Sequence, residues 1–285
     1  MVHNFAFFRP AKMEVLTCSI VVFKPDPDLL ESVIEAFFAA CAEAGLADTA
    51  VAVDLIDNDA AGYGRLVRRP SWPDRVRLIA APANRGYGAG NNLSILDSAA
   101  EFHLVLNPDA ILAGDAIRRA LDILRARPEV GLLVPQVRGF DGAMHYLCKR
   151  NPSLFDLFLR GFASAPVKRL FARRMAWFEM REHDYDQPIC PVPFPTGCCM
   201  FFRGDLLRSL GGFDERFFLY LEDADIGRRV NRVARVAYEP SVRVRHQWQR
   251  GSHNRLGLRW QTIRSGFYYW RKWGGVWRGT SEDGR

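Results

Sequence analysis

The sequence contains no uninterrupted apolar run near the roughly eighteen residues that a membrane-spanning helix requires. The opening residues, MVHNFAFFRPAK, include no apolar stretch long enough for the core of a signal peptide. The six cysteines show neither CxxC spacing nor the density of a disulfide scaffold. We therefore predict no transmembrane helix, a cytoplasmic location and reduced, mostly buried thiols. Residues 1–13 are predicted to form an N-terminal extension, within which Met13 is a candidate natural start.

The composition is that of an ordinary globular protein, with 285 residues, 48% apolar and 25% charged. The net charge of +7 is unevenly distributed. Residues 228–285 contain fourteen Lys and Arg but three Asp and Glu, a local charge of +11, so the rest of the chain carries −4. A basic end indicates an anionic partner, and charge alone leaves open a nucleic acid, a phosphorylated ligand or a membrane surface.

Apolar, β-prone segments alternate with helical patterns along the first half of the chain. The predicted strands are 15–23, 50–56, 76–80, 102–106 and 130–135, and the predicted helices are 28–44, 88–100 and 115–127. This alternation predicts an α/β fold with a mostly parallel sheet flanked by helices. Ligands of such sheets bind beyond the carboxyl ends of the strands.

Asp57, Asn84 and Asp109 each follow the end of a predicted strand, so we expect them to converge. Asn84 opens the glycine-rich segment 84–92, whose backbone amides can approach a phosphate or ribose at a helix start, although a glycine turn without a ligand explains it equally well. Asp109 closes the sequence Asn107-Pro108-Asp109, which suits a simple turn. The same carboxylate also suits Mg²⁺, which shares its ligands with phosphate oxygens and water.

The chain is less regular from about residue 139 to residue 195. Residues 154–180 mix apolar, aromatic and basic side chains. We predict that they are helical and either face an acceptor or pack on the core with a solvated basic face. Strands are predicted near 198–202, 234–238 and 242–246, and residues 268–273 form a basic aromatic segment.

Three acids, Glu222, Asp223 and Asp225, directly follow an apolar, aromatic segment and open an amphipathic helical pattern. The helix dipole explains one or two of them. The apolar residues place the cluster in or near a pocket, and a carboxylate partly withdrawn from water suits a general base. His246 ends a predicted strand and is either structural or a second metal ligand. A nucleic-acid-binding role would leave the acids unexplained, so we predict no nucleic-acid partner.

Together and in this order, the motifs resemble family 2 glycosyltransferases of the GT-A fold, particularly the bacterial rhamnosyltransferase-like branch. That branch acts in O-antigen, lipopolysaccharide and cell-wall polysaccharide assembly. The resemblance covers about residues 14–255 and rests on 19–23, 57–58, 84–92, 106–109, 196–197, 211–215, 222–225, His246 and Ser252. It implies an inverting transferase that moves L-rhamnose from dTDP-L-rhamnose to a saccharide on undecaprenyl diphosphate. A UDP-hexose-dependent transferase and a catalytically inactive sugar-nucleotide-binding protein are the alternatives.

The resemblance also implies roles for individual residues. The donor nucleotide would contact Phe23, Asp57, Asn84, Gly86 and Asn107. A divalent metal, Mg²⁺ or Mn²⁺, would bind Asp109 and His246, because Asn107 stands where a strict family motif has a second acid. The acceptor or diphosphate would lie near Thr196 and Gly197. Asp223 would be the catalytic base, with Glu222 and Asp225 as supporting neighbours.

The predicted division of the chain follows these roles. Residues 1–13 are the extension, 14–138 bind the donor, 139–255 bind the acceptor and carry catalysis, and 256–285 form a basic aromatic end. This end is predicted to make the enzyme peripheral on the inner face of the plasma membrane. The contact residues would be Arg259, Trp260, Arg264, Tyr268, Tyr269, Trp270, Arg271, Lys272, Trp273 and Trp277. A solvated helical face or an oligomer contact is the alternative.

Overall fold

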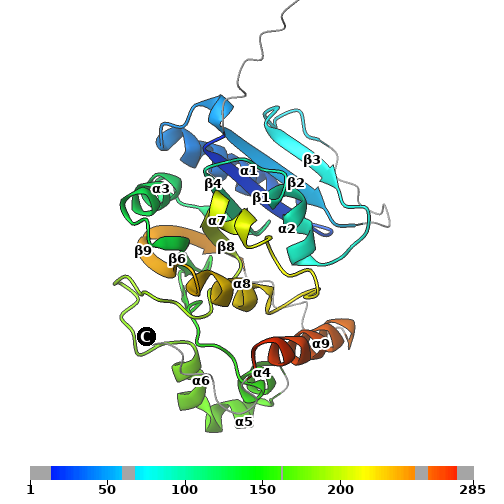
Figure 1. Ribbon diagram of the computed structural model, residues 1–285, viewed down its shortest axis with the longest axis vertical. Coiled ribbons are helices and arrows are strands. Elements are labelled where there is room, and N and C mark those ends of the chain that lie inside the picture. The colour runs from blue at the N-terminus through cyan, green and yellow to red at the C-terminus, as the bar shows by residue number, and fades with distance from the viewer. Residues whose placement is uncertain (1–13, 60–67, 162, 248–255, 275–285) are drawn as a thin grey trace, which may run out of the picture.

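The computed structural model describes residues 14–59, 68–161, 163–247 and 256–274 (Figure 1). Four parallel strands form one side of the sheet in the order β3-β2-β1-β4. They are β1 (Leu16–Val22), β2 (Val51–Asp57), β3 (Val76–Ala80) and β4 (Phe102–Leu106). β1 and β4 are buried along their whole length, which is why their sequences are nearly continuous apolar runs.

Strands from the second half of the chain extend the same sheet. β8 (Cys199–Arg203) lies antiparallel between β4 and β6 (Val130–Arg138), β9 (Arg235–His246) runs parallel to β6, and β5 (Ala110–Leu112) lies at the edge. The short β7 (Met144–His145) pairs with β6. The predicted α/β fold with a mostly parallel sheet is confirmed, and in the described residues both predicted halves share that sheet.

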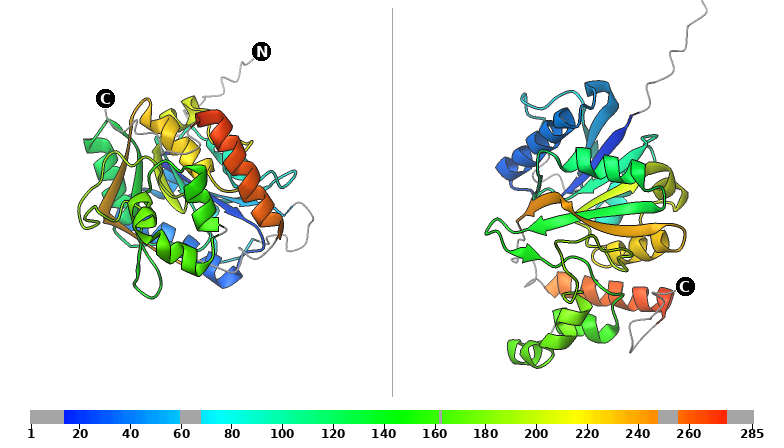
Figure 2. Two further views of the ribbon diagram at one scale, coloured as in Figure 1. Left: turned by 90° about the horizontal axis from the view of Figure 1, so that it is seen from below. Right: turned by 90° about the vertical axis from the view of Figure 1, so that its left-hand side faces the viewer.

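Helices cover both faces of the sheet (Figures 1 and 2). α1 (Pro27–Glu43) and α3 (Ala116–Ala126) pack on one face, and α2 (Tyr87–Ile95), α7 (Gly204–Ser209) and α8 (Glu222–Asn231) pack on the other. α1 begins at Asp26, whose carboxylate accepts hydrogen bonds from the amides of Asp28 and Leu29. Proline at the first helical position suits this start, because its missing N–H has no partner there in any case.

The predicted secondary structure was wrong in several details. The helix predicted over 88–100 ends at Ile95, and the Ser98 hydroxyl accepts a hydrogen bond from the amide of Ala100 where the chain turns towards β4. The strands predicted at 234–238 and 242–246 are the single strand β9, because a bulge between these segments keeps both paired with β6. The three-residue strand β5 and the 3₁₀ turn Asp48–Ala50 were not predicted.

Four helices lie together at one end of the molecule, away from β1–β4 (Figures 1 and 2). Three are short: α4 (Leu154–Gly161), α5 (Ala165–Leu170) and α6 (Ala172–Phe178). The helical prediction for residues 154–180 is thus confirmed, although the helix is broken twice. The fourth, α9 (Leu256–Trp273), packs against α4.

Candidate active site

The carboxyl ends of β2 and β3 are joined by asparagine side chains. The amide nitrogen of Asn58 donates to Asn84 Oδ1 (3.1 Å) and to the carbonyl oxygen of Gly86 (3.2 Å). Asn84 Oδ1 also accepts from the amide of Gly86 at 3.1 Å. Asp57 is the last residue of β2, directly before Asn58, and Phe23 follows β1 with half of its surface exposed. Parallel pairing therefore brings these predicted donor-binding residues to one edge of the sheet.

Two glycines of the 84–92 segment allow the 213–218 segment to pack closely against it. Gly86 has φ = +102°, and a Cβ atom there would lie 1.9 Å from the carbonyl oxygen of Phe218. That carbonyl accepts a 3.0 Å hydrogen bond from the amide of Tyr87, the first residue of α2. A Cβ on Gly88 would lie 2.8 Å from Phe213 Cβ. The first amide of α2 is thus bound to the 213–218 segment, not left for a phosphate.

Tyr87 connects three segments that carry predicted site residues. Its hydroxyl lies 2.9 Å from Asn107 Oδ1 and 3.0 Å from the carbonyl oxygen of Gly197. The amide of Asn107 donates to the carbonyl of Cys198. The amide of Gly197 donates to Asp223 Oδ2 at 3.1 Å. The structure therefore joins the turn after β4, the start of β8 and the start of α8 around one tyrosine.

Asp109 and His246 form a close pair. Asp109 Oδ1 lies 3.0 Å from His246 Nε2, and both side chains are partly exposed. The pairing of β5 with β9 places Ala110 opposite His246, which brings the side chains of Asp109 and His246 together. Among the described residues, no group of three or more His, Cys, Asp or Glu side chains could hold a metal. A metal at this pair would take its other ligands from water or a substrate, as Mg²⁺ does with phosphates.

Two adjacent carboxyl groups begin α8. The preceding residues, Tyr220 and Leu221, both have φ = +69°, a conformation that is uncommon and costly for side chains of this size. Burial raises the pKa of Glu222 well above its usual value, and the charge of Asp223 raises it further. Burial also raises the pKa of Asp223, opposed by the positive charge of Lys149 and by the bound amides. A partly buried carboxylate with a raised pKa is suited to accept a proton near neutral pH.

Asp225, predicted to support the base, binds the C-terminal helix. Its Oδ2 accepts from Arg229 Nε at 2.8 Å. Its Oδ1 lies 2.6 Å from Lys272 Nζ and accepts from Trp273 Nε1 at 2.8 Å. Lys272 also pairs with Asp214 at 2.7 Å. The contacts of Asp225 thus hold α9 on α8.

Part of the predicted membrane contact is wrong, because four of its residues lie on the face of α9 that packs against the rest of the fold. Tyr268 and Tyr269 donate to Asp214 and Asn151, and Lys272 and Trp273 bind Asp225, so these four side chains are occupied within the fold. The sequence predicts that they contact the membrane, because the whole segment is basic and aromatic. The exposed side chains of α9 include Trp260, Ile263, Arg264, Phe267 and Arg271. Ser252, Trp277 and the side chain of Arg259 lie outside the described residues.

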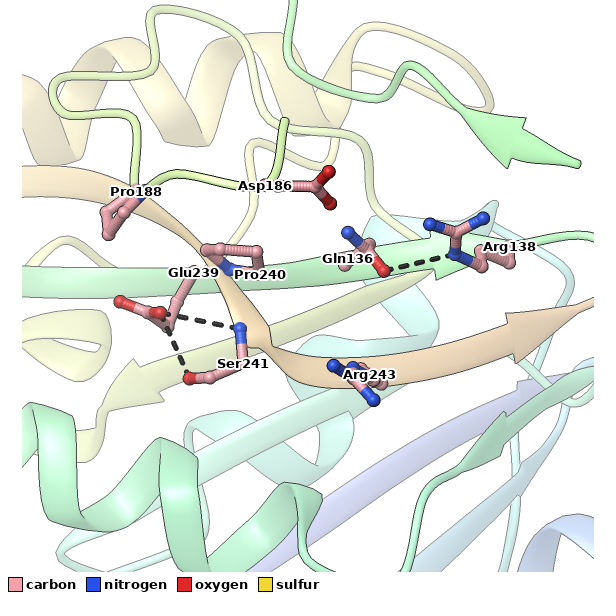
Figure 3. Close-up of a pocket in the computed structure, with 8 residues that line it drawn as sticks. All are labelled: Gln136, Arg138, Asp186, Pro188, Glu239, Pro240, Ser241 and Arg243. Carbon is pink, nitrogen blue, oxygen red and sulfur yellow. Dashed lines mark hydrogen bonds between the residues drawn. The ribbon is translucent and has the colours of Figure 1, made fainter. Parts of the chain in front are cut away.

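A polar groove of about 760 Å³ lies beside the bulge of β9 (Figure 3). Two arginines, two acids and four other residues line it: Gln136, Arg138, Asp186, Pro188, Glu239, Pro240, Ser241 and Arg243. It contains none of the predicted site residues.

Sequence patterns indicated no role for Tyr87 or Lys149. Tyr87 lies within the glycine-rich segment 84–92, but the segment was given no role for its hydroxyl. Lys149 lies in the irregular stretch, is 4% exposed, and donates to Thr196 Oγ1 at 2.7 Å. Its partner is distant in the sequence, so local patterning carries no signal for it.

Comparisons with known proteins show the family of the chain. The sequence profile described as "Glycosyltransferase like family 2" matches residues 17–262. The N-acetylglucosaminyl-diphospho-decaprenol L-rhamnosyltransferase of Mycobacterium tuberculosis is 29% identical over 245 residues, covering 82% of this chain and 76% of that protein. The O-antigen biosynthesis protein RfbC of Myxococcus xanthus is 25% identical over 74% of this chain and 16% of its own.

A solved structure supports the same fold. The mannosyltransferase PcManGT from Pyrobaculum calidifontis, in complex with GDP-Man and Mn²⁺, superposes with a TM-score of 0.58 at 19% identity. The match covers 93% of this chain and 66% of the mannosyltransferase chain. The predicted GT-A fold is confirmed. Among the described residues, no helix is both long and apolar enough to cross a bilayer.

Proposed function

Because the chain belongs to glycosyltransferase-like family 2 and is a glycosyltransferase, we propose that it is an inverting, metal-dependent enzyme that transfers L-rhamnose from dTDP-L-rhamnose. The observation that carries the proposal is the set of hydrogen bonds through Tyr87 that joins the 107–109 turn, Gly197 and Asp223. The name of the mycobacterial relative supports a diphosphate-linked lipid saccharide as acceptor, and that of the Myxococcus relative supports a role in surface polysaccharide synthesis.

Asp223 is the general base of the proposed reaction. It takes the proton of the acceptor hydroxyl while that oxygen forms a bond to the anomeric carbon of the donor sugar. The bond from this carbon to the diphosphate oxygen breaks on the opposite face, and the nucleoside diphosphate leaves with the electron pair. The amides of Gly197 and Ala224 bind the two carboxylate oxygens, so the base is oriented before the acceptor arrives.

Asp109 and His246 would hold the divalent metal. The pair fits such an ion, because it offers one carboxylate oxygen and one imidazole nitrogen at the edge where a diphosphate would supply further oxygens. When bound, the metal would neutralise negative charge on the leaving diphosphate. Gly197 binds Asp223, so Thr196 and Gly197 would lie beside the base, and Phe23, Asp57, Asn84 and Gly86 would contact the nucleotide.

Metal-dependent donor binding is the first expected result. In thermal-shift assays with dTDP-L-rhamnose and UDP-hexoses, one donor should stabilise the protein only with Mg²⁺ or Mn²⁺. A donor at a hundredfold excess over its Kd contributes about 2.7 kcal/mol, which is a shift of about 5 °C for a chain of this size. Asp109→Asn and His246→Gln should each raise the metal concentration needed for a half-maximal thermal shift by about tenfold or more. Even a mutation of a residue that only hydrogen-bonds to a metal ligand lowers metal affinity by about tenfold.

Asp122→Asn is the matched control, because Asp122 is an exposed carboxylate on α3 and is none of the predicted site residues. It should keep the wild-type response. An equal response of Asp109→Asn and the wild type would remove Asp109 as a metal ligand. A shift produced by a UDP-hexose and not by dTDP-L-rhamnose would replace the proposed donor.

The end of the molecule formed by α4, α5, α6 and α9 is the proposed membrane contact. Its exposed apolar side chains include Leu170 (79% exposed), Trp260 (65%) and Phe267 (56%). Exposed cations accompany them on α5, α6 and α9: Lys168, Arg169, Arg173, Arg264 and Arg271. From Ala163 to Phe178 the sequence has no acid. Apolar insertion beside cations suits an anionic lipid surface, where a lipid-linked acceptor would be embedded.

Vesicle flotation tests this contact. Wild-type protein should float with vesicles of phosphatidylcholine and phosphatidylglycerol, and less so at high salt, because salt screens the cations. The double variant Trp260→Ser/Phe267→Ser should bind these vesicles at least about tenfold more weakly than the wild type. Each large apolar side chain that is buried in the bilayer contributes about 1.5–3 kcal/mol to binding. Point variants are preferable to truncation after Leu256, which would remove the contacts of Lys272 with Asp214 and Asp225.

The control for flotation is Leu93→Ser/Leu96→Ser, which changes two exposed apolar side chains on or next to α2. These residues lie outside the proposed surface, so this variant should float like the wild type. Equal flotation of both double variants and the wild type would show that the proposed surface does not contact the membrane.

A further inference from the structure

Lys149 is a buried cation beside the proposed base. The residue is 4% exposed, and its backbone N–H and C=O form a two-way bridge with Phe194 at 2.9 Å. Its ammonium group lies 4.8 Å from the centre of the Phe194 ring and donates to Thr196 Oγ1 at 2.7 Å. Within the described residues it forms no ion pair with a carboxylate. A buried ammonium group with one neutral acceptor is costly, so its retention calls for a specific reason.

The position of Thr196 relates this cation to Asp223. The Thr196 hydroxyl donates its own proton to the carbonyl of Leu147 and accepts from Lys149, so it is satisfied in both directions. The next residue, Gly197, donates its amide to Asp223 Oδ2 at 3.1 Å. Lys149 thus binds the residue next to the one whose amide binds Asp223, and its positive charge favours the ionised form of that carboxylate.

The adjacent Glu222 lies in a different environment. Its Oε2 atom is buried and has no hydrogen-bond partner among the described residues. The charge of Asp223 raises the pKa of Glu222, and the charge of Glu222 raises the pKa of the Tyr87 hydroxyl, and neither of these two neighbours is a cation. Two adjacent carboxyl groups in a buried site do not both ionise readily. The positive charge of Lys149 lowers the pKa of Asp223, whereas no cation is among the groups that shift the pKa of Glu222.

We propose that Lys149 is a positioning residue whose ammonium group makes Asp223, and not Glu222, the ionised carboxylate that accepts the proton. This inference rests on the proposed role of Asp223 as base. Among the groups around Lys149 and Asp223, some raise and others lower the pKa of each residue. Arg160 also favours an ionised Asp223, whereas burial opposes it. Burial and Arg160 lower the pKa of Lys149 to about 7, while Asp223, Glu179 and Cys198 oppose that shift. Lys149 is therefore mostly charged below about pH 7.

Lys149→Met should raise the titration midpoint of Asp223 by about one to three pH units, the effect of removing a neighbouring opposite charge. The experiment uses full-length protein labelled with ¹³C-aspartate, in which the Cγ resonance of Asp223 is followed with pH. Its assignment comes from the signal lost in Asp223→Asn. Lys149→Arg should return the midpoint toward the wild-type value, because a guanidinium keeps its charge. The acidic limb of donor turnover should move by the same amount.

Lys168→Met is the matched control, because it removes one exposed lysine and should leave the midpoint unchanged. Lys149→Met should fold, since it removes a buried charge and leaves the Thr196 hydroxyl donating to Leu147. Lys149→Gln, which keeps a donor for Thr196, serves as the second variant. An unchanged Asp223 midpoint in a folded Lys149→Met or Lys149→Gln protein would overturn the proposal. The titration needs no substrate, so it decides the role of Lys149 even if no donor turns over.

Discussion

An Asp223→Asn protein should fold like the wild type and lose donor turnover by about 10²–10⁴-fold, the range that general-base assistance contributes. The fold is retained because asparagine keeps the shape of the side chain and one oxygen for the amide of Gly197 or Ala224. Turnover falls because a carboxamide does not accept the proton of the acceptor hydroxyl. Measuring kcat and the thermal midpoint on the same preparation separates the two effects.

Asp205→Asn is the matched control for this variant. Asp205 also stands in the first turn of a helix, where its Oδ1 accepts from the amide of Leu206, but it is exposed on α7. It should keep the wild-type kcat. Wild-type turnover by a well-folded Asp223→Asn protein would show that another group takes the proton.

Gly86→Ala should destabilise the fold by about 2–5 kcal/mol. The new Cβ atom would lie 1.9 Å from the carbonyl oxygen of Phe218, at a residue whose φ is +102°. Left-handed backbone costs an L-residue about 1–2 kcal/mol, and overpacking adds about 1–3 kcal/mol. Because Phe218 leads directly into the strained segment before Glu222, its displacement should also move the base and abolish donor turnover. Urea unfolding, followed by circular dichroism, measures the loss of stability.

Gly142→Ala separates strain from collision. Gly142 has φ = +80°, but a Cβ atom there would have no neighbour within 4 Å. This variant should lose only about 1–2 kcal/mol and keep its turnover. Equal losses for the two variants would show that the close approach of Phe218 to Gly86 does not matter for stability.

The strands and the edge that binds ligands could be predicted from local sequence. β1, β2 and β4 are buried on both faces, so nearly every residue in them must be apolar, and that pattern is visible without knowledge of their partners. Strands of this kind pair in parallel and bring their carboxyl ends to one edge. Asn58, the residue after Asp57, therefore meets Asn84 and donates a hydrogen bond to it. The pairing of Asp109 with His246 was predicted from the family resemblance.

The contacts of the C-terminal helix could not be predicted in this way. A basic aromatic run has the same sequence pattern whether its side chains face lipid or the rest of the fold. Trp273 faces inward because Asp225, 48 residues earlier, offers a buried carboxylate oxygen at the right place. The same buried carboxylate binds α9, so it does not lie free beside the base.

The sequence by itself thus determined the α/β architecture, the sheet edge and the acids that open α8, because each depends on the polarity of neighbouring residues. Only the tertiary structure decided that Tyr87 joins three site segments and that Lys149 lies beside the base. Lys149 and Thr196 are 47 residues apart, and Tyr87 and Gly197 are 110 apart. The effect of a charge or a hydroxyl on a carboxylate depends on burial and on distance in space, and neither is a property of local sequence.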